Sequence, residues 1–481
     1  MNFIVDRNNG LKAQTVVYPV FKDQMDFEAI HGLTIHSHMG ESGKCTWFFG
    51  RNQEENILLV GLGEQKKFQM DRLRAAFGTA GRALNQEKQK QVRVSYECLQ
   101  KLADASCTQV DLVMATVEGW LLGTYAFDAY KSKKAERHVE LVQIELETSD
   151  ALEQAIQLGK IRAEGVIFAR ELGNEPANRL RPETFVKRIR QQFSNTSVSI
   201  TVYQGEELEK RQMNGLLSVG KGSKYPPAFV ELRYCTDPSK PLVALVGKGM
   251  TYDAGGISLK SGRDLSDMRM DMCGAAAVVG ALDIIVKSQM AVNLLVLVAT
   301  AENIPDGGAM LPGDVIQYPN GVTVQVGNTD AEGRLILADA LIHAKNLGAV
   351  ECVDIATLTG ACIAALGERM AGVWGDDALV DDLRHVGQFA GDRVWPMPLE
   401  DEYEDLLKSH YADISNIGKG PYAGAITAAL FLRKFVDPSM KWAHVDMAGP
   451  MEATETKGYL VAGATGYGAR LLADFVAVRS K

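Results

Sequence analysis

The feature that most restricts the fold of this sequence is an alternation of strand and helix patterns over residues 172–481. Continuous apolar runs such as Leu242-Val-Ala-Leu-Val-Gly lead into segments whose apolar residues recur at helical spacing. Strands that are apolar on both faces are typical of sheets covered by helices on both sides. The pattern therefore predicts an open α/β sheet with helices on both faces.

Individual elements follow from the same patterns. In this region we expect strands over 292–300, 322–326 and 350–356, and helices over 274–287 and 335–346. The first part of the chain also alternates, with strand-like runs at 56–61, 92–96 and 109–113 and a helical pattern over 70–84.

A chain of 481 residues exceeds one ordinary core, so we expect two domains. The prediction is a smaller N-terminal α/β domain with an assembly or regulatory role, a linker helix, and a larger C-terminal mixed α/β sheet domain that carries the active site. Their expected ranges are 1–148, 149–171 and 172–481.

Composition limits the cellular compartments and the classes of partner that we expect for this protein. The net charge of −9 argues against a protein that mainly coats nucleic acid, although a local basic face stays possible. The seven widely spaced cysteines form neither a disulfide framework nor a zinc finger. No secretory signal or membrane-spanning run is present, so we expect a cytoplasmic protein without a membrane partner.

Two segments interrupt the pattern where strands end, which is where open α/β sheets place their sites. The first runs from Val246 to Lys260, and the second is Gly327-Asn-Thr-Asp-Ala-Glu-Gly-Arg334. The first is not a phosphate-binding loop, because Gly249 follows Lys248 where that motif needs Ser or Thr. Its glycines are better explained by close backbone approach to a site.

The second segment concentrates charge. In an extended stretch alternate side chains share a face, so Asp330, Glu332 and Arg334 are expected to point the same way. Asp253 and Asp271 at neighbouring strand ends bring the number of carboxylates to four. Clustered carboxylates repel one another unless cations balance them, and four of them suit a pair of divalent ions.

These motifs resemble the leucyl aminopeptidases, also called cytosol aminopeptidases, which are two-metal peptidases. Asn328-Thr-Asp-Ala-Glu-Gly-Arg-Leu335 is similar to the family signature in full. The stretches from Gly247 to Lys260, from Met270 to Ala275 and from Ala356 to Ala361 also resemble it. The resemblance is strong over 172–481 and only general over 1–150.

The resemblance implies a division of roles. Two divalent ions per subunit, Zn²⁺ or Mn²⁺, would be bound by Lys248, Asp253, Asp271, Asp330 and Glu332, with Asp253 and Glu332 bridging. Lys248 binds a metal only as a neutral amine, and burial beside dications would lower its pKa.

The implied reaction releases N-terminal, leucine-like residues from peptides. A water shared by two metals becomes a hydroxide near neutral pH. The implied catalytic pair is Lys260, which stabilises the oxyanion, and Arg334, which holds a bicarbonate.

The resemblance also implies a substrate pocket and partners. The pocket residues would be Met268, Asn328, Thr357, Leu358, Gly360 and Ala448, with Met451 nearby. The substrates would be short peptides with a free N-terminus. The chain would assemble as a homohexamer, a dimer of trimers.

Three alternatives stay open at this point. A two-metal phosphoesterase also needs bridging carboxylates, although such sites usually include histidine ligands. A nucleic-acid-binding regulator would need a concentrated basic face on the first domain. A catalytically inactive structural protein of the same fold is disfavoured by the intact set of ligand and catalytic residue types.

Overall fold

The computed structural model of the protein describes residues 1–7, 13–23, 33–51, 54–102, 107–262 and 264–480. The chain forms two compact units. Residues 1–167 and 454–462 make the first, and residues 168–453 and 463–481 make the second. The expected α/β class is confirmed, with the smaller unit at the N-terminus.

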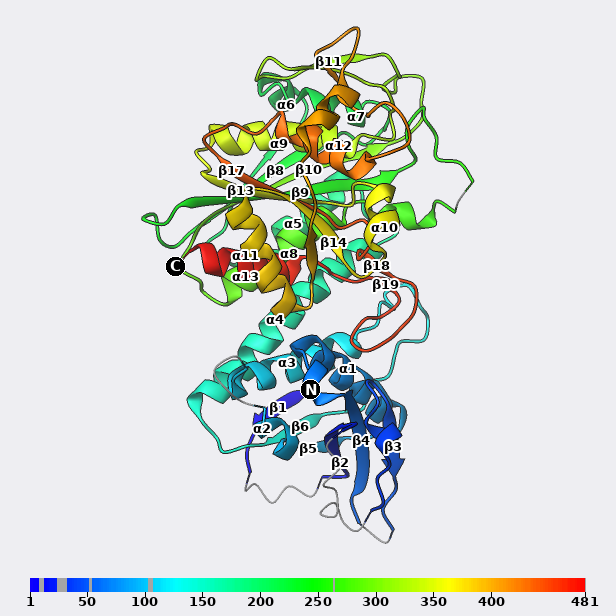
Figure 1. Ribbon diagram of the computed structural model, residues 1–481, viewed down its shortest axis with the longest axis vertical. Helices are drawn as coiled ribbons and strands as arrows, with labels where there is room; N and C mark the ends of the chain where they lie inside the picture. The colour runs from blue at the N-terminus through cyan, green and yellow to red at the C-terminus, as the bar shows by residue number, and fades with distance from the viewer. Residues whose placement is uncertain (8–12, 24–32, 52–53, 103–106, 263, 481) are drawn as a thin grey trace. The chain divides into compact units, whose positions relative to one another are not determined.

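The first unit is built on a six-stranded sheet with helices packed against it (Figure 1). All neighbouring strands are parallel except β3 and β4. In sheet order the strands are β1 (Asn2–Val5), β6 (Leu141–Glu145), β5 (Gln91–Ser95), β2 (Thr15–Phe21), β4 (Asn56–Gly63) and β3 (Cys45–Phe48). Its helices include α1 (Met70–Gln86), α2 (Glu97–Gln100) and α3 (Gln109–Gly123).

The strand expected at 109–113 is wrong, because this run opens helix α3. Thr108 caps the helix: its side chain accepts a hydrogen bond from the Asp111 amide, and the Asp111 carboxylate accepts one from the Thr108 amide. This capping box starts a helix whose apolar residues continue to Gly123. A short apolar run alone does not distinguish a strand from a buried helix, and the cap decides between them.

Helix α4 (Asp150–Asn174) covers the segment where we expected a connecting helix, and the division between the units falls inside it. The first unit also takes up residues 454–462 from near the C-terminus, which a contiguous first domain does not include. Among the described residues, no helix combines the length and the apolar character needed to cross a membrane.

The second unit contains an eight-stranded mixed sheet. Its order is β15 (Val394–Pro396), β14 (Ala371–Gly375), β17 (Lys441–Asp446), β13 (Glu351–Ala356), β9 (Leu242–Asp253), β10 (Asn293–Asn303), β8 (Ala228–Cys235) and β7 (Ser199–Tyr203). The four central strands β17, β13, β9 and β10 are parallel to one another.

Helices cover both faces of this sheet, as the sequence predicts (Figure 1). One face carries α7 (Asn214–Gly220), α9 (Gly333–Asn346) and α12 (Gly424–Arg433). The other carries α8 (Cys273–Lys287), α11 (Asp377–Ala390) and α13 (Ala469–Arg479). Even-numbered residues of β9, including Ala244 and Val246, belong to the core beneath α9.

The order of the central strands creates a switch point. The chain leaves β9 through α8 to β10 on one side, and then crosses through α9 to β13 on the other side of β9. Ligands of open α/β sheets bind outside the carboxyl ends of strands at such a point. A small sheet of β11 (Val315–Gln317), β12 (Thr323–Gln325) and β16 (Ile414–Ser415) leads into the loop beside it.

Candidate metal centre and active site

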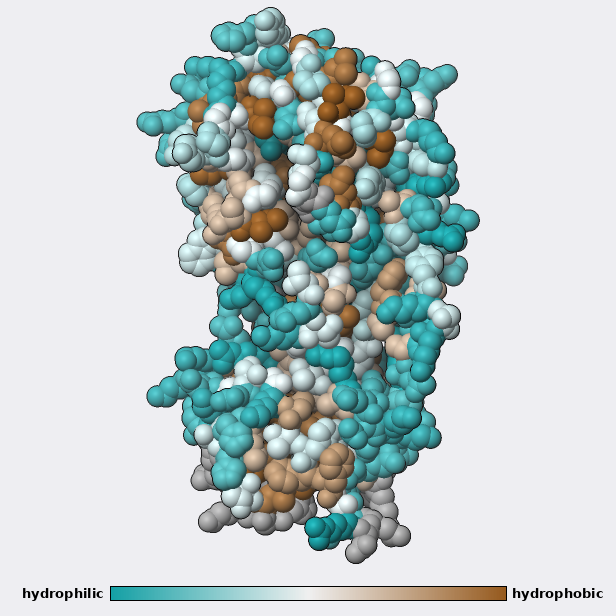
Figure 2. Space-filling model, turned by 90° about the vertical axis from the view of Figure 1, so that its right-hand side faces the viewer, coloured by the Kyte–Doolittle hydropathy of each residue, from teal (hydrophilic) through white to brown (hydrophobic). Residues whose placement is uncertain are grey.

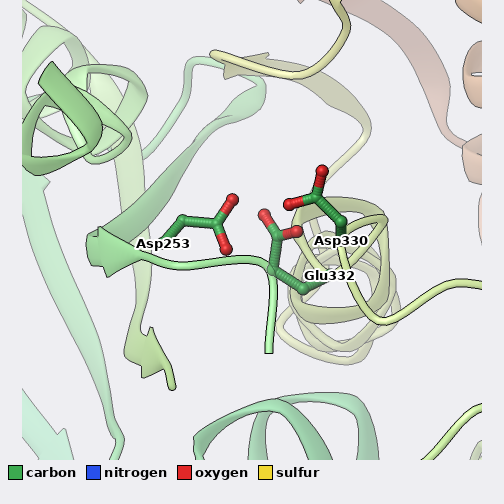
Figure 3. A group of neighbouring side chains, drawn as sticks. All are labelled: Asp253, Asp330 and Glu332. Atoms are coloured by element: carbon green, nitrogen blue, oxygen red, sulfur yellow. The ribbon is translucent and has the colours of Figure 1, made fainter. Parts of the chain in front are cut away.

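Three carboxylates meet at the switch point (Figure 3). Asp253 ends β9, Glu332 precedes the first turn of α9, and Asp330 lies in the turn between β12 and α9. One oxygen from each lies within 4.8 Å of the others, and the carboxylates point toward one another. Asp253 and Glu332 are buried. This grouping suits a divalent cation, because like charges so close need a positive ion to balance them.

The backbone brings these acids together in a way that differs from the expected extended stretch. The amide of Ala331 donates to the carbonyl of Asn328 at 3.2 Å, which closes a turn. Glu332 is already helical, with φ −77° and ψ −35°, and Gly333 begins α9. Asp330 and Glu332 therefore converge through a turn followed by a helix start.

Two lysines lie among the carboxylates. The ammonium of Lys248 is 2.8 Å from Asp271 Oδ1 and 2.8 Å from Glu332 Oε1. The ammonium of Lys260 is 2.8 Å from Asp253 Oδ2 and also contacts Asp330. Four carboxylates thus face two ammonium groups, and the cluster keeps an excess of negative charge.

The close packing of Lys248 explains a glycine of the signature. Lys248 lies on β9 and points toward the start of α9. A Cβ on Gly333 would come within 2.8 Å of the Lys248 ammonium nitrogen and 2.6 Å of its Cε. Real Cβ contacts are not this short, so a side chain at residue 333 would displace the end of Lys248 from its partners Asp271 and Glu332.

The charges of the two lysines are stabilised by their neighbours. Burial lowers the pKa of Lys248, but Asp271, Glu332 and Asp253 raise that pKa by more, so the net shift is upward. The pKa of Lys260 is raised in the same way, since Asp253 and Glu332 outweigh its burial. A neutral Lys248 that acts as a ligand therefore requires metal ions to replace its proton.

The pKa values of two of the acids are raised as well, which disfavours their charged form. Burial raises the pKa of Asp271, which Lys248 partly offsets while the neighbouring acids add to the rise. The pKa of Asp330 is also raised, first by burial and then by Asp253 and Glu332. The same crowding that stabilises the ammonium groups destabilises the carboxylates, because the cluster is short of positive charge.

One buried atom directly supports a cation site. Asp271 is 7% exposed, and its Oδ1 accepts from Lys248 at 2.8 Å and from the Thr357 hydroxyl at 2.7 Å. Its Oδ2 is buried without a hydrogen-bond partner. An unpaired buried carboxylate oxygen is costly unless a cation is near. The donor set of carboxylates and one amine fits Zn²⁺ or Mn²⁺.

Arg334 lies at the edge of the cluster, in the first turn of α9. Its Nη1 donates to the Asn416 carbonyl at 2.8 Å, and its Nε is buried without a hydrogen-bond partner. Burial lowers the pKa of Arg334 to about 10, so the guanidinium stays charged at neutral pH. A charged group with an unused buried donor is suited to hold an anion.

The residues expected to form the substrate pocket lie on four segments. Met268 belongs to the short helix η3 (Ser266–Met270), Asn328 precedes the turn, and Ala448 follows β17. Thr357 and Leu358 follow β13, and Gly360 opens helix α10 (Gly360–Leu366). The structure joins two of these segments through Asp446, whose Oδ1 accepts from the amides of Leu358 at 3.3 Å and Ala448 at 3.1 Å.

The sequence patterns did not single out three buried residues of the site. Asn303 ends β10, is the register partner of Asp253, and donates to Asp253 Oδ1 at 2.8 Å. Asp446 ends β17 and holds the pocket segments. A polar residue at the end of a buried strand was the available signal for both. Asn416 had no such signal, because it reaches the turn from 88 residues away in the sequence.

Comparison with known proteins identifies the family. Residues 167–473 match the catalytic domain of the cytosol aminopeptidase family, and residues 31–134 match its N-terminal domain. A probable cytosol aminopeptidase from Sulfurihydrogenibium sp. is 36% identical over 100% of this chain and 98% of its own. One from Geobacter sulfurreducens is 41% identical over 89% of this chain and 86% of its own.

Solved structures agree. The bottromycin maturation enzyme BotP in complex with Mn has a TM-score of 0.86 and 32% identity, over 98% of this chain and 100% of its own. A mutant of tomato leucine aminopeptidase has a TM-score of 0.88 and 30% identity, over 99% of this chain and 96% of its own. The chain therefore belongs to the cytosol aminopeptidase family of metal-dependent exopeptidases.

Proposed function

We propose that this protein releases N-terminal residues, leucine-like ones preferred, from short peptides in the cytoplasm. The observation that carries the proposal is the cluster of Asp253, Asp330 and Glu332 with Lys248 and Lys260 between the acids. No histidine belongs to the acidic group that the described residues form, so the geometry does not favour a phosphoesterase.

The metal ligands in this proposal are Lys248, Asp253, Asp271, Asp330 and Glu332. Two bound divalent ions, Zn²⁺ or Mn²⁺, would supply Lewis acidity, water activation and a site for the free α-amine of the substrate. The unpaired oxygen of Asp271 and the excess negative charge support two such ions. The related BotP structure with Mn supports manganese as one of the choices.

Lys260 is proposed to stabilise the oxyanion that forms when the scissile carbonyl is attacked. Its pKa is raised, so it donates hydrogen bonds as a full cation, and its side chain is only 15% exposed. A charged donor in a site with little water stabilises a developing negative charge far more than it would in solution. Lys260 must turn from its carboxylate partners toward the substrate to act in this way.

Arg334 is proposed to anchor bicarbonate, which takes the proton from the attacking water. The guanidinium itself cannot serve as the base, because it keeps its proton at neutral pH. The Nε of Arg334 is buried without a hydrogen-bond partner, and its Nη1 is held by the Asn416 carbonyl. The guanidinium is therefore fixed in place with a donor left for a planar anion, which Arg binds well.

The first-residue pocket is proposed to consist of Met268, Asn328, Thr357, Leu358, Gly360 and Ala448. Met268 and Ala448 are buried, and Leu358 is half-buried, which gives an apolar slot with an adaptable methionine. These features favour leucine or methionine side chains over charged ones.

The proposed assembly is a homohexamer, a dimer of trimers. The second unit exposes large apolar side chains, including Leu259, Leu311 and Tyr422, at 55%, 51% and 83%. Figure 2 shows hydrophobic residues grouped among hydrophilic ones on this unit. Apolar surface that gathers into a contiguous patch is typical of interfaces.

The experiment is hydrolysis of leucine p-nitroanilide by the purified protein after chelation and after addition of Zn²⁺, Mn²⁺ or Co²⁺. The N-acetylated substrate is the control. We expect activity that needs both a metal and a free amine. Equal cleavage of the acetylated substrate, or no activity with any metal, would contradict the proposal.

A further inference from the structure

The side chain of Asn416 binds one loop on both sides of a proposed metal ligand. Its Oδ1 accepts from the amides of Gly327 at 2.7 Å and Asn328 at 3.2 Å. Its Nδ2 donates to the carbonyls of Asn328 at 2.7 Å and Ala331 at 3.2 Å. Asp330 lies between these two carbonyls, so the backbone around its carboxylate is fixed from both directions.

The main chain of Asn416 makes a further link to the site. Its carbonyl accepts from Arg334 Nη1 at 2.8 Å, while its amide donates to Gln325 at 3.0 Å. Asn416 therefore contacts strand β12 before the turn, the turn itself, and the guanidinium of Arg334 after the turn.

Burial makes this arrangement rigid. Asn416 is 0% exposed, and both hydrogens of its amide and both acceptor directions of its oxygen are used. Moving the side chain would leave several buried backbone groups unpaired, each at a cost of about 1–3 kcal/mol. The strand ladder cannot replace these bonds, because the β12–β16 pairing ends at Gln325 and Ser415.

We infer that Asn416 is a positioning residue: it holds the 327–331 loop so that Asp330 faces the metal cluster, and it orients Arg334 through its own carbonyl. The catalytic part of this inference rests on the proposed function. The metal-binding part rests on the proposed ligand role of Asp330 and on the geometry of the loop.

The test compares Asn416→Ala, Asn416→Asp and Asn174→Ala with wild type. Asn416→Asp keeps the acceptors for Gly327 and Asn328 but replaces the donors to the two carbonyls by a repelling oxygen. Asn174 is a matched control, since it is buried and its Oδ1 accepts from the Ala464 amide at 2.9 Å. The readouts are Mn²⁺ affinity, amide hydrogen exchange at 327–331, and kcat and KM for leucine p-nitroanilide.

Both Asn416 variants should weaken Mn²⁺ binding and lower kcat by about 10–100-fold while KM changes little, as is typical when a group behind a metal ligand is lost. Exchange at Gly327 and Asn328 should accelerate in Asn416→Ala and less in Asn416→Asp. Asn174→Ala should match wild type in all three readouts. In a double mutant with Arg334→Ala, the loss in kcat should be smaller than the product of the two single losses.

Faster exchange with unchanged Mn²⁺ affinity and unchanged kcat would overturn the inference, since Asn416 would then serve the fold alone. Unchanged exchange would overturn it too. If wild type shows no peptidase activity with any metal, the proposed function fails, and Mn²⁺ affinity with exchange still decides the role of Asn416.

Discussion

At the scale of single residues, Lys248 and Lys260 each lie between two carboxylates, yet we assign them different roles. Lys248 is buried between Asp271 and Glu332, where a metal can reach its nitrogen only after the proton leaves. Lys260 lies on a loop after β9 and is the more exposed of the two. This difference predicts that removing Lys260 leaves the ligand set in place.

Lys260→Ala should keep both metals and lose turnover by about 10²–10³-fold, the range typical of a lost oxyanion donor. Metal content by mass spectrometry and kcat on leucine p-nitroanilide measure the two effects. The control is Lys408→Ala, which removes an exposed lysine paired with Asp405. An unchanged kcat would show that Lys260 is not catalytic.

Glu332→Gln should release metal and abolish activity together, because it removes one charge from the proposed bridging position. We expect Mn²⁺ affinity to fall by more than about 100-fold, because mutating even a residue that only hydrogen-bonds to a metal ligand lowers metal affinity by about 10–100-fold. Glu302→Gln is the matched control, a buried glutamate that accepts from Ser223. Normal metal content and turnover in Glu332→Gln would refute the bridging role.

The sequence could single out the charged residues that converge here because their types are chemically distinctive. Asp253, Asp330 and Glu332 converge as expected, although the expected extended geometry was wrong. Asn416 could not be singled out, because an asparagine has the same appearance in a surface loop as in a buried network. Only the fold shows which asparagine is enclosed.

At the scale of elements, α9 joins the site to the core. Glu332 is its N-cap, its first turn carries Arg334, and its middle packs against α7 through Asp339. Asp339 Oδ2 accepts from the Leu216 amide at 2.7 Å in a buried position. Burial raises the pKa of Asp339 to about 8, although the backbone amides of Leu216 and Gly215 lower it in part.

This upward shift predicts a pH effect on stability. Below about pH 4 the folded and unfolded chains both hold the proton, whereas between about pH 4 and 8 only the folded chain does. The free energy of unfolding therefore falls as pH rises through this window. The slope is at most about 1.4 kcal/mol per pH unit.

Asn does not titrate and keeps an acceptor for Leu216, so Asp339→Asn should gain stability relative to wild type as pH rises from 4 to 8. Urea unfolding of both proteins at several pH values measures the difference, in which shared titrations cancel. A difference that is constant across this window would contradict a raised pKa for Asp339.

The patterns that predicted elements worked best for long, mostly apolar runs. The strands expected at 292–300 and 350–356 are β10 and β13, and the helix expected at 274–287 is α8. The strand predicted at 109–113 was wrong, because the capping signal at Thr108 outweighs a short apolar pattern. Local chemistry at the ends of an element decided its type there.

At the scale of the whole molecule, the proposed homohexamer predicts a mass six times that of one subunit. Light scattering coupled to size-exclusion chromatography measures it directly. The exposed apolar side chains of the second unit are expected to be covered in that assembly. A monomeric mass at micromolar concentration would contradict the proposed assembly and leave the peptidase proposal standing.

The order of the two α/β units could be predicted from length and pattern, but the placement of 454–462 in the first unit could not. No local signal in the sequence shows that a segment near the C-terminus belongs to the unit formed by the first part of the chain. Such contacts depend on the three-dimensional path of the chain and not on the composition of the segment.

The most direct test of the central claim is anomalous diffraction from crystals of the protein loaded with Mn²⁺. We expect two anomalous peaks among Asp253, Asp330 and Glu332, with Lys248 and Asp271 beside one of them. A single peak, or peaks at other residues, would contradict a two-metal centre at this switch point.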